Sequence, residues 1–174
     1  MLPDLDALAD WDERLRQVAR EPVAVERAIE LARGLLDITS DPREQSRVHG
    51  YLGNAARLLG RDSDAVLALQ RSLDLAIALD DAELATVATI RLAEAHRCFD
   101  RLDVAEGLLH SALETGERRD FALQHLGKTL LDAGRPGEAV EALEEALELR
   151  RAAGDRALVT STERALALAR ERVG

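Results

Sequence analysis

Aromatic residues make up only 2% of this 174-residue chain, and cysteine and lysine occur once each, as Cys98 and Lys128. Because β-sheets favour aromatic and β-branched side chains, this scarcity argues against a sheet protein. A single cysteine excludes an intramolecular disulfide and is typical of a reducing compartment. The apolar runs are far shorter than a bilayer-spanning helix, and residues 1–6 are acidic where a secretory signal would be basic and then apolar. We therefore expect a cytoplasmic protein with no membrane segment, and the preference for arginine over lysine indicates a bacterial source.

The residue patterns that carry chemistry are also missing. The chain has no glycine-rich phosphate loop after a strand, no His-Glu-x-x-His run and no Gly-x-Ser-x-Gly elbow. Its four histidines are scattered, and we expect His96 in the core and His49, His110 and His125 on the surface. A net charge of −10 argues against nucleic acid as a partner, because backbone phosphates would be repelled. The sequence predicts no enzyme, no cofactor and no metal site.

What the chain has in abundance is leucine and alanine, which together supply roughly a third of the positions and are strong helix formers. Helix boundary signals interrupt these runs at intervals. Asp41-Pro42 is an N-cap followed by proline at the first helical position, and Gly154-Asp155 ends one helix and caps the next. The composition and the boundaries together predict an all-α protein.

Three segments align without internal gaps, namely Ser46–Leu79, Thr86–Arg119 and Asp120–Ala153. The seventh place of each is leucine and the eighth is small. The pairs are Leu52-Gly53, Leu92-Ala93 and Leu126-Gly127. The twentieth place is always alanine, and leucine follows four residues later. These pairs are Ala65 and Leu69, Ala105 and Leu109, and Ala139 and Leu143. A fixed period of this length predicts a solenoid of helix-turn-helix units.

The spacing has a physical reason. A small residue on the first helix must face small residues on the second, or the two axes cannot approach closely, and leucines then fill the groove on either side. This arrangement resembles the tetratricopeptide repeat (TPR) family, whose pattern has a Leu-Gly pair in the first helix and alanine at two places in the second. The resemblance covers Ser46–Ala153. It departs from the family pattern where His96 and Leu130 replace a usual tyrosine.

The resemblance implies a right-handed superhelical solenoid of antiparallel helix pairs, with about nine helices in a single domain over residues 1–174. Residues 1–40 are predicted to form a degenerate helix pair, Pro3–Arg20 and Pro22–Ile38. Residues 156–173 are predicted to form a single closing helix that caps the exposed end of the stack.

By the same resemblance, the first helices of the repeats line a concave groove that binds a peptide or helix of another protein. The expected groove residues are Arg47, Asn54, Arg57, Glu94, Arg97, Phe121, Gln124 and Lys128. They carry more positive than negative charge inside an acidic protein, so we expect a partner segment with some acidic character. Glu94 and Gln124 stand where carboxylate-clamping family members have asparagine and lysine, which speaks against a clamp for a C-terminal carboxylate.

Two other interpretations stay open. The N-terminal pair with Trp11 is a candidate surface for a homodimer, in which case the chain is a homo-oligomerising structural module. The chain is also typical of a sensor or regulatory TPR segment of a bacterial signalling or transcription-regulation system.

Overall fold

The computed structural model describes all 174 residues and is built almost entirely from helices. A 3₁₀ turn η1 (Asp6–Leu8) and a hairpin of strands β1 (Ala9–Trp11) and β2 (Gln17–Ala19) precede eight α-helices. The helices are α1 (Pro22–Ile38), α2 (Pro42–Leu58), α3 (Asp62–Ala78), α4 (Ala82–Cys98), α5 (Leu102–Glu114), α6 (Arg119–Asp132), α7 (Pro136–Ala153) and α8 (Arg156–Val173).

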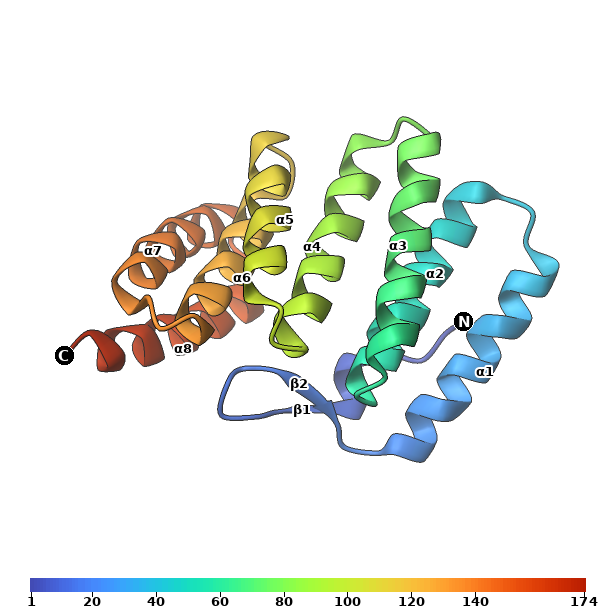
Figure 1. The fold of residues 1–174 in the computed structure, drawn as a ribbon, viewed down its shortest axis with the longest axis horizontal. Helices are drawn as coiled ribbons and strands as arrows, with labels where there is room; N and C mark the ends of the chain where they lie inside the picture. Colours follow the sequence, from blue (N-terminus) through green and yellow to red (C-terminus); the bar gives the residue numbers. More distant parts are fainter.

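The helices stack side by side in chain order to form a solenoid (Figure 1). Helices α2 and α3, α4 and α5, and α6 and α7 form three helix pairs over the repeating part of the sequence, with α1 before them and α8 after them. The predicted all-α solenoid of helix pairs is confirmed. It has eight α-helices where about nine were expected, because the first predicted helix does not form.

That first helix, predicted over Pro3–Arg20, is the main error of the sequence interpretation. The segment instead forms the hairpin, in which Ala9 pairs with Ala19 and Trp11 with Gln17. Asp12 explains the difference, since its carboxylate accepts the backbone N–H groups of Arg14 and Arg16 at 2.9 and 2.8 Å. Such local side-chain bonds give the backbone an alternative to helical hydrogen bonds and close a turn.

Asp side chains begin several of the helices. Asp41, Asp81 and Asp155 each accept a backbone N–H from the first turn of α2, α4 and α8, at 3.0 to 3.1 Å. These bonds satisfy donors that have no partner within the helix. At the other end, Gly154 ends α7 with φ of 77°, a left-handed conformation that glycine adopts without strain.

The close approach within a repeat depends on missing Cβ atoms at the eighth place. A Cβ on Gly53 would lie 2.4 Å from Cγ of Leu69, and one on Gly127 would lie 2.5 Å from Cγ of Leu143. The glycines therefore face leucine side chains of the second helix, and not only small residues as the spacing argument expected. Leu69 and Leu143 are fully buried as a result.

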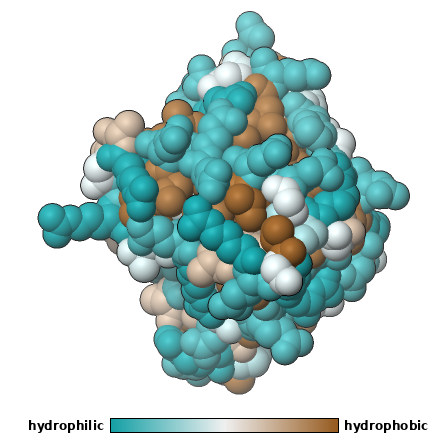
Figure 2. Space-filling view, turned by 90° about the vertical axis from the view of Figure 1, so that its left-hand side faces the viewer, coloured by the Kyte–Doolittle hydropathy of each residue, from teal (hydrophilic) through white to brown (hydrophobic).

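Helix α8 covers the C-terminal end of the stack. Helix α8 packs on α7 and buries Ala165, Leu166 and Ala169 in the main core, which comprises 19 residues. The face of the molecule at this end is mostly hydrophilic, with separate hydrophobic patches (Figure 2). None of the helices has the length and apolar character needed to cross a membrane.

Candidate peptide-binding groove

Helices α2, α4 and α6 line one face of the solenoid, and this face is hollowed by two adjoining cavities, which together we call the groove. The first has a volume of about 920 Å³ and lies between the N-terminal residues 1–6 and helices α2 and α4. The second, of about 420 Å³, lies between α4, α6 and α8 beside the hairpin. Asn54, Val87 and Arg91 line both cavities, so the groove is continuous.

Charge is divided between the two cavities. The first is lined by more acidic than basic side chains. They are Asp4, Asp6, Asp41, Glu44, Asp81 and Glu83 against Arg43, Arg47 and Arg91. The second has the opposite balance. It is lined by Arg57, Arg91, Arg118, Lys128 and Arg150 against Asp6 and Glu94. We call the second cavity the cationic cavity.

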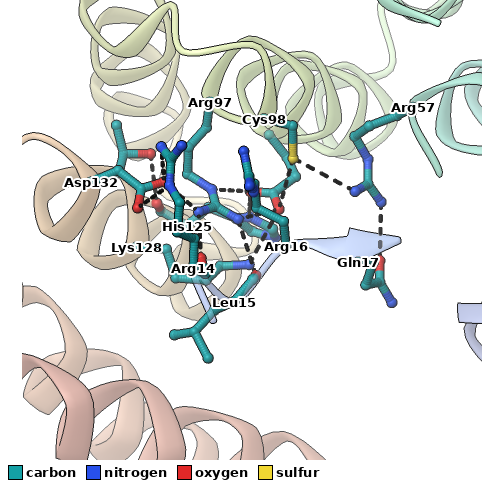
Figure 3. A network of polar contacts seen from close by, with 12 residues as sticks. Arg14, Leu15, Arg16, Gln17, Arg57, Arg97, Cys98, His125, Lys128 and Asp132 are labelled. Atoms are coloured by element: carbon teal, nitrogen blue, oxygen red, sulfur yellow. Dashed lines mark hydrogen bonds and ion pairs between the residues drawn. The ribbon is translucent and has the colours of Figure 1, made fainter. Parts of the chain in front are cut away.

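A buried polar network forms the floor between α4 and α6 (Figure 3). Glu94 accepts two hydrogen bonds from the Arg97 guanidinium, at 2.8 and 2.9 Å, and one from Nδ1 of His125 at 2.8 Å. Nζ of Lys128 lies 3.5 Å from the same carboxylate. Because Arg97 also pairs with Asp132 at 2.8 Å, a run of alternating charges crosses the floor of the groove.

The network shifts the pKa values of its members strongly. Burial alone would raise the pKa of Glu94, but Arg97, Lys128 and His125 outweigh it and hold the pKa well below the usual value. Burial, aided by the charge of Lys128, lowers the pKa of His125 to about 4. Burial also lowers the pKa of Lys128 to about 8. At neutral pH His125 is therefore an uncharged imidazole that donates its Nδ1–H to the Glu94 carboxylate.

The hairpin closes over this network. Arg97 donates hydrogen bonds to the backbone carbonyl oxygens of Arg14 and Leu15, both at 3.1 Å. At the other edge Arg57 donates to the side chain of Gln17 at 3.0 Å (Figure 3). The Cys98 thiol lies 3.8 Å from Arg57, and burial raises its pKa, so the thiol is a poor nucleophile.

Arginines surround Phe121 in the cationic cavity. The guanidinium carbons of Arg118 and Arg150 lie 4.3 and 4.9 Å from the centroid of its ring, a cation–π arrangement on a half-buried aromatic side chain. Arg150 is also held by Asp120 at 3.1 Å. Arg91 has no such carboxylate, and the pKa of its guanidinium is lowered by burial and then by the neighbouring charge of Arg118.

The residues predicted for the groove lie on the expected face, but they divide into two kinds. Arg47 is exposed in the first cavity, and Asn54, Phe121 and Gln124 line the cationic cavity. Oε1 of the buried Gln124 has no hydrogen-bond partner. The remaining four are buried and bonded within the chain, and all but Arg97 also line the cationic cavity. They are Arg57, Glu94, Arg97 and Lys128.

Sequence reasoning missed Arg91, His125 and Arg150, which lie at repeat positions that the resemblance does not direct inward. The prediction of a surface position for His125 was wrong, because only 20% of its side chain is exposed and it is bonded to Glu94. The insertion of the hairpin was also missed. No sequence signal marks it, since the contacts join residues as far as 118 positions apart.

Comparison with solved structures identifies the architecture. A Podosopora anserina protein with nearly identical TPR-like repeats of the kinesin light chain type shares 19% identity, with a TM-score of 0.66, over 87% of this chain and 80% of that one. MamA shares 20% identity, with a TM-score of 0.56, over 88% of this chain and 91% of that one. The fold is a TPR-type solenoid. The apo form of RapI shares 14% identity, with a TM-score of 0.70, over 88% of this chain and 58% of that one.

The TPR resemblance is therefore confirmed at the level of the fold. No family model matches the sequence, and no curated protein matches it.

Proposed function

We propose that this TPR-type solenoid is a non-catalytic scaffold or adaptor that binds a segment of another protein in its groove, with acidic side chains of that segment in the cationic cavity. The observation that carries the proposal is the surplus of arginine in this cavity. Arg91 in particular is largely removed from water and has no carboxylate within the chain.

The chemistry of the cavity suits an acidic segment. A guanidinium donates two parallel hydrogen bonds to a carboxylate, and this pairing strengthens as water is excluded. The ring of Phe121 and the unpaired amide oxygen of Gln124 add an apolar and a polar contact beside the arginines. The cavity volume of about 420 Å³ has room for one or two side chains of a bound peptide.

The homodimer interpretation stays a prediction, since Trp11 is 44% exposed, although it lies on β1 and not on a helix. Trp11, expected on an outward helix pair, lies in the groove with its ring 5.6 Å from Nζ of Lys128. The interpretation as a sensor segment of a larger regulatory system stays a prediction, and it is compatible with the same mode of binding.

Matched peptide pairs test the acidic preference. A set of fluorescein-labelled peptides of about twelve residues, each made in a glutamate and a glutamine version, is titrated with the full chain by fluorescence polarisation. A hydrogen bond to a charged group contributes about 1.5–3 kcal/mol, so we expect the glutamate versions to bind about tenfold tighter or more. Arg91→Ala combined with Arg118→Ala should remove most of that preference.

The control variant carries Arg27→Ala with Arg33→Ala, two exposed positions on α1 away from the groove that change the net charge by the same amount. It should keep the glutamate preference. Equal affinity for the two versions, or an unchanged preference in the Arg91 and Arg118 variant, would show that the cationic cavity does not select acidic partners.

A further inference from the structure

The tip of the N-terminal hairpin, residues Asp12–Arg16, occupies a site that the solenoid builds for a peptide backbone. The guanidinium of Arg97 presents two donors to the carbonyl oxygens of Arg14 and Leu15. Arg97 is fully buried and is held from behind by Glu94, which fixes the direction of these donors. A rigid arginine that caps two successive carbonyls recognises a tight turn of any polypeptide that fits there.

The same site selects an arginine side chain. Nη2 of Arg14 lies 2.6 Å from the Asp100 carboxylate and 3.1 Å from that of Asp132, and its Nε donates to Asp132 at 3.2 Å. Asp132 is almost fully buried, and Asp100 lies on the exposed rim. Two carboxylates of the solenoid thus hold one guanidinium that comes from outside the repeats.

The neighbouring residue of the tip fills an apolar position. Leu15 is 6% exposed and belongs to the main core cluster together with residues of the repeats. Its φ of 56° is left-handed, which is unusual for a leucine, and the side-chain bonds of Asp12 hold the turn in this shape. The solenoid therefore contacts the arginine side chain, the leucine side chain and the backbone of the turn.

The rest of the hairpin is only partly buried, although Ala9 and Ala19 at its base pack against a cluster formed by α1 and α2. The side chains of Trp11 and Val18 on its strands are 44% and 42% exposed, so burial is concentrated at the tip. The tip carries the contacts with Arg97, Asp100 and Asp132, and a peptide ligand that presents an arginine and a leucine at a tight turn can make the same contacts.

We propose that the Asp12–Arg16 tip is an intramolecular ligand of the solenoid at a site beside the groove, and that a partner segment with an arginine followed by a leucine at a tight turn binds the same site by displacing it. The proposal rests on the groove as a protein-binding surface, but it does not require the acidic preference of the cationic cavity. The occupied site is the one formed by Arg97, Asp100 and Asp132.

The experiment adds the tip as a separate peptide to a chain whose own tip is altered. The probe is a fluorescein-labelled peptide of residues 9–19, with phenylalanine in place of Trp11 and with its paired end residues, Ala9 and Ala19, replaced by disulfide-linked cysteines. The receiver is the full chain with Arg14→Ser and Leu15→Ser, which empties the site. Because a tethered ligand acts at an effective concentration in the millimolar range, we expect the variant to bind the probe about 100-fold tighter than the wild-type chain does.

Variants of the receiver and of the probe test whether the contacts of Arg14 and Leu15 determine binding. Asp100→Asn on the receiver, at an exposed rim position, should lower the affinity for the probe severalfold without loss of helix content. A probe with serine in place of Arg14 and Leu15 should not bind. Arg91→Ala with Arg118→Ala on the receiver should leave probe binding unchanged, which separates this result from the test of the cationic cavity.

A second measurement uses the wild-type chain with its own tip in place. Trp11 is the single tryptophan, so excess probe that displaces the hairpin from the wild-type chain should lower the anisotropy of Trp11 emission. The proposal is overturned if the folded serine variant binds the probe no better than the wild type does, if the serine probe binds as well as the native one, or if the receiver captures a second copy of the chain but not the probe.

Discussion

The charge of Glu94 should contribute strongly to the stability of the fold. Glu94→Gln keeps the volume and shape of the side chain but removes the charge that faces Arg97, His125 and Lys128. Breaking a buried ion pair by removing one partner costs about 3–5 kcal/mol, because the remaining charge is left without compensation. Since Arg97 keeps Asp132 as a partner at 2.8 Å, we expect the lower end, about 3 kcal/mol, with most of the loss arising at Lys128.

The assay is urea unfolding followed by helical circular dichroism at pH 7, with Glu144→Gln as the matched control. Glu144 pairs with Arg170 at 2.8 Å, but both side chains are about half exposed, so this control should lose only about 0–1 kcal/mol. If Glu94→Gln and Glu144→Gln lower the free energy of unfolding by the same amount, the charges on the floor of the groove are hydrated, and the argument from burial is refuted.

Two further predictions concern packing and pH. Gly127→Ala should destabilise the chain by about 1–2 kcal/mol, because overpacking against Leu143 exceeds the gain in helix propensity, whereas Gly107→Ala, with open space around its Cβ, should stabilise it by up to about 1 kcal/mol. Equal effects in urea unfolding would refute this argument. Stability should also fall as pH drops from about 6.5 towards 4, since the unfolded chain protonates His125 in this window and the folded chain does not. The loss is at most roughly 3 kcal/mol, and His125→Asn should remove most of it, which unfolding at a series of pH values would measure.

The helices and their pairing could be predicted because their signals are local. Asp41, Asp81 and Asp155 cap helices where the capping residues stand in the sequence, and Gly127 recurs at the place where two helices approach. Each signal acts within one helix pair, so equivalent positions have the same structural role in all three repeats. The same local signals delimit α2, α4 and α6, which carry all of the residues predicted for the groove.

The state of those residues could not be predicted, because it depends on neighbours that are distant in sequence. Arg97 has the sequence context of an exposed groove arginine, yet its side chain is fully buried by the carbonyl groups of the hairpin 82 and 83 residues earlier. Lys128 likewise differs from a solvated lysine because the folded chain buries it, with Glu94 3.5 Å and the ring of Trp11 5.6 Å from its Nζ.

The order of leucines, small residues and caps is thus enough to specify a TPR-type stack, since helix periodicity and close packing act over one repeat. The occupation of the groove is decided by the tertiary structure. A short turn around Asp12 competes with a helix at the N-terminus, and the carboxylates of Asp100 and Asp132 then hold its arginine across the groove. Burial and charge, summed over elements that meet only in the folded chain, determine which groove residues are engaged within the chain and which face the open cavity.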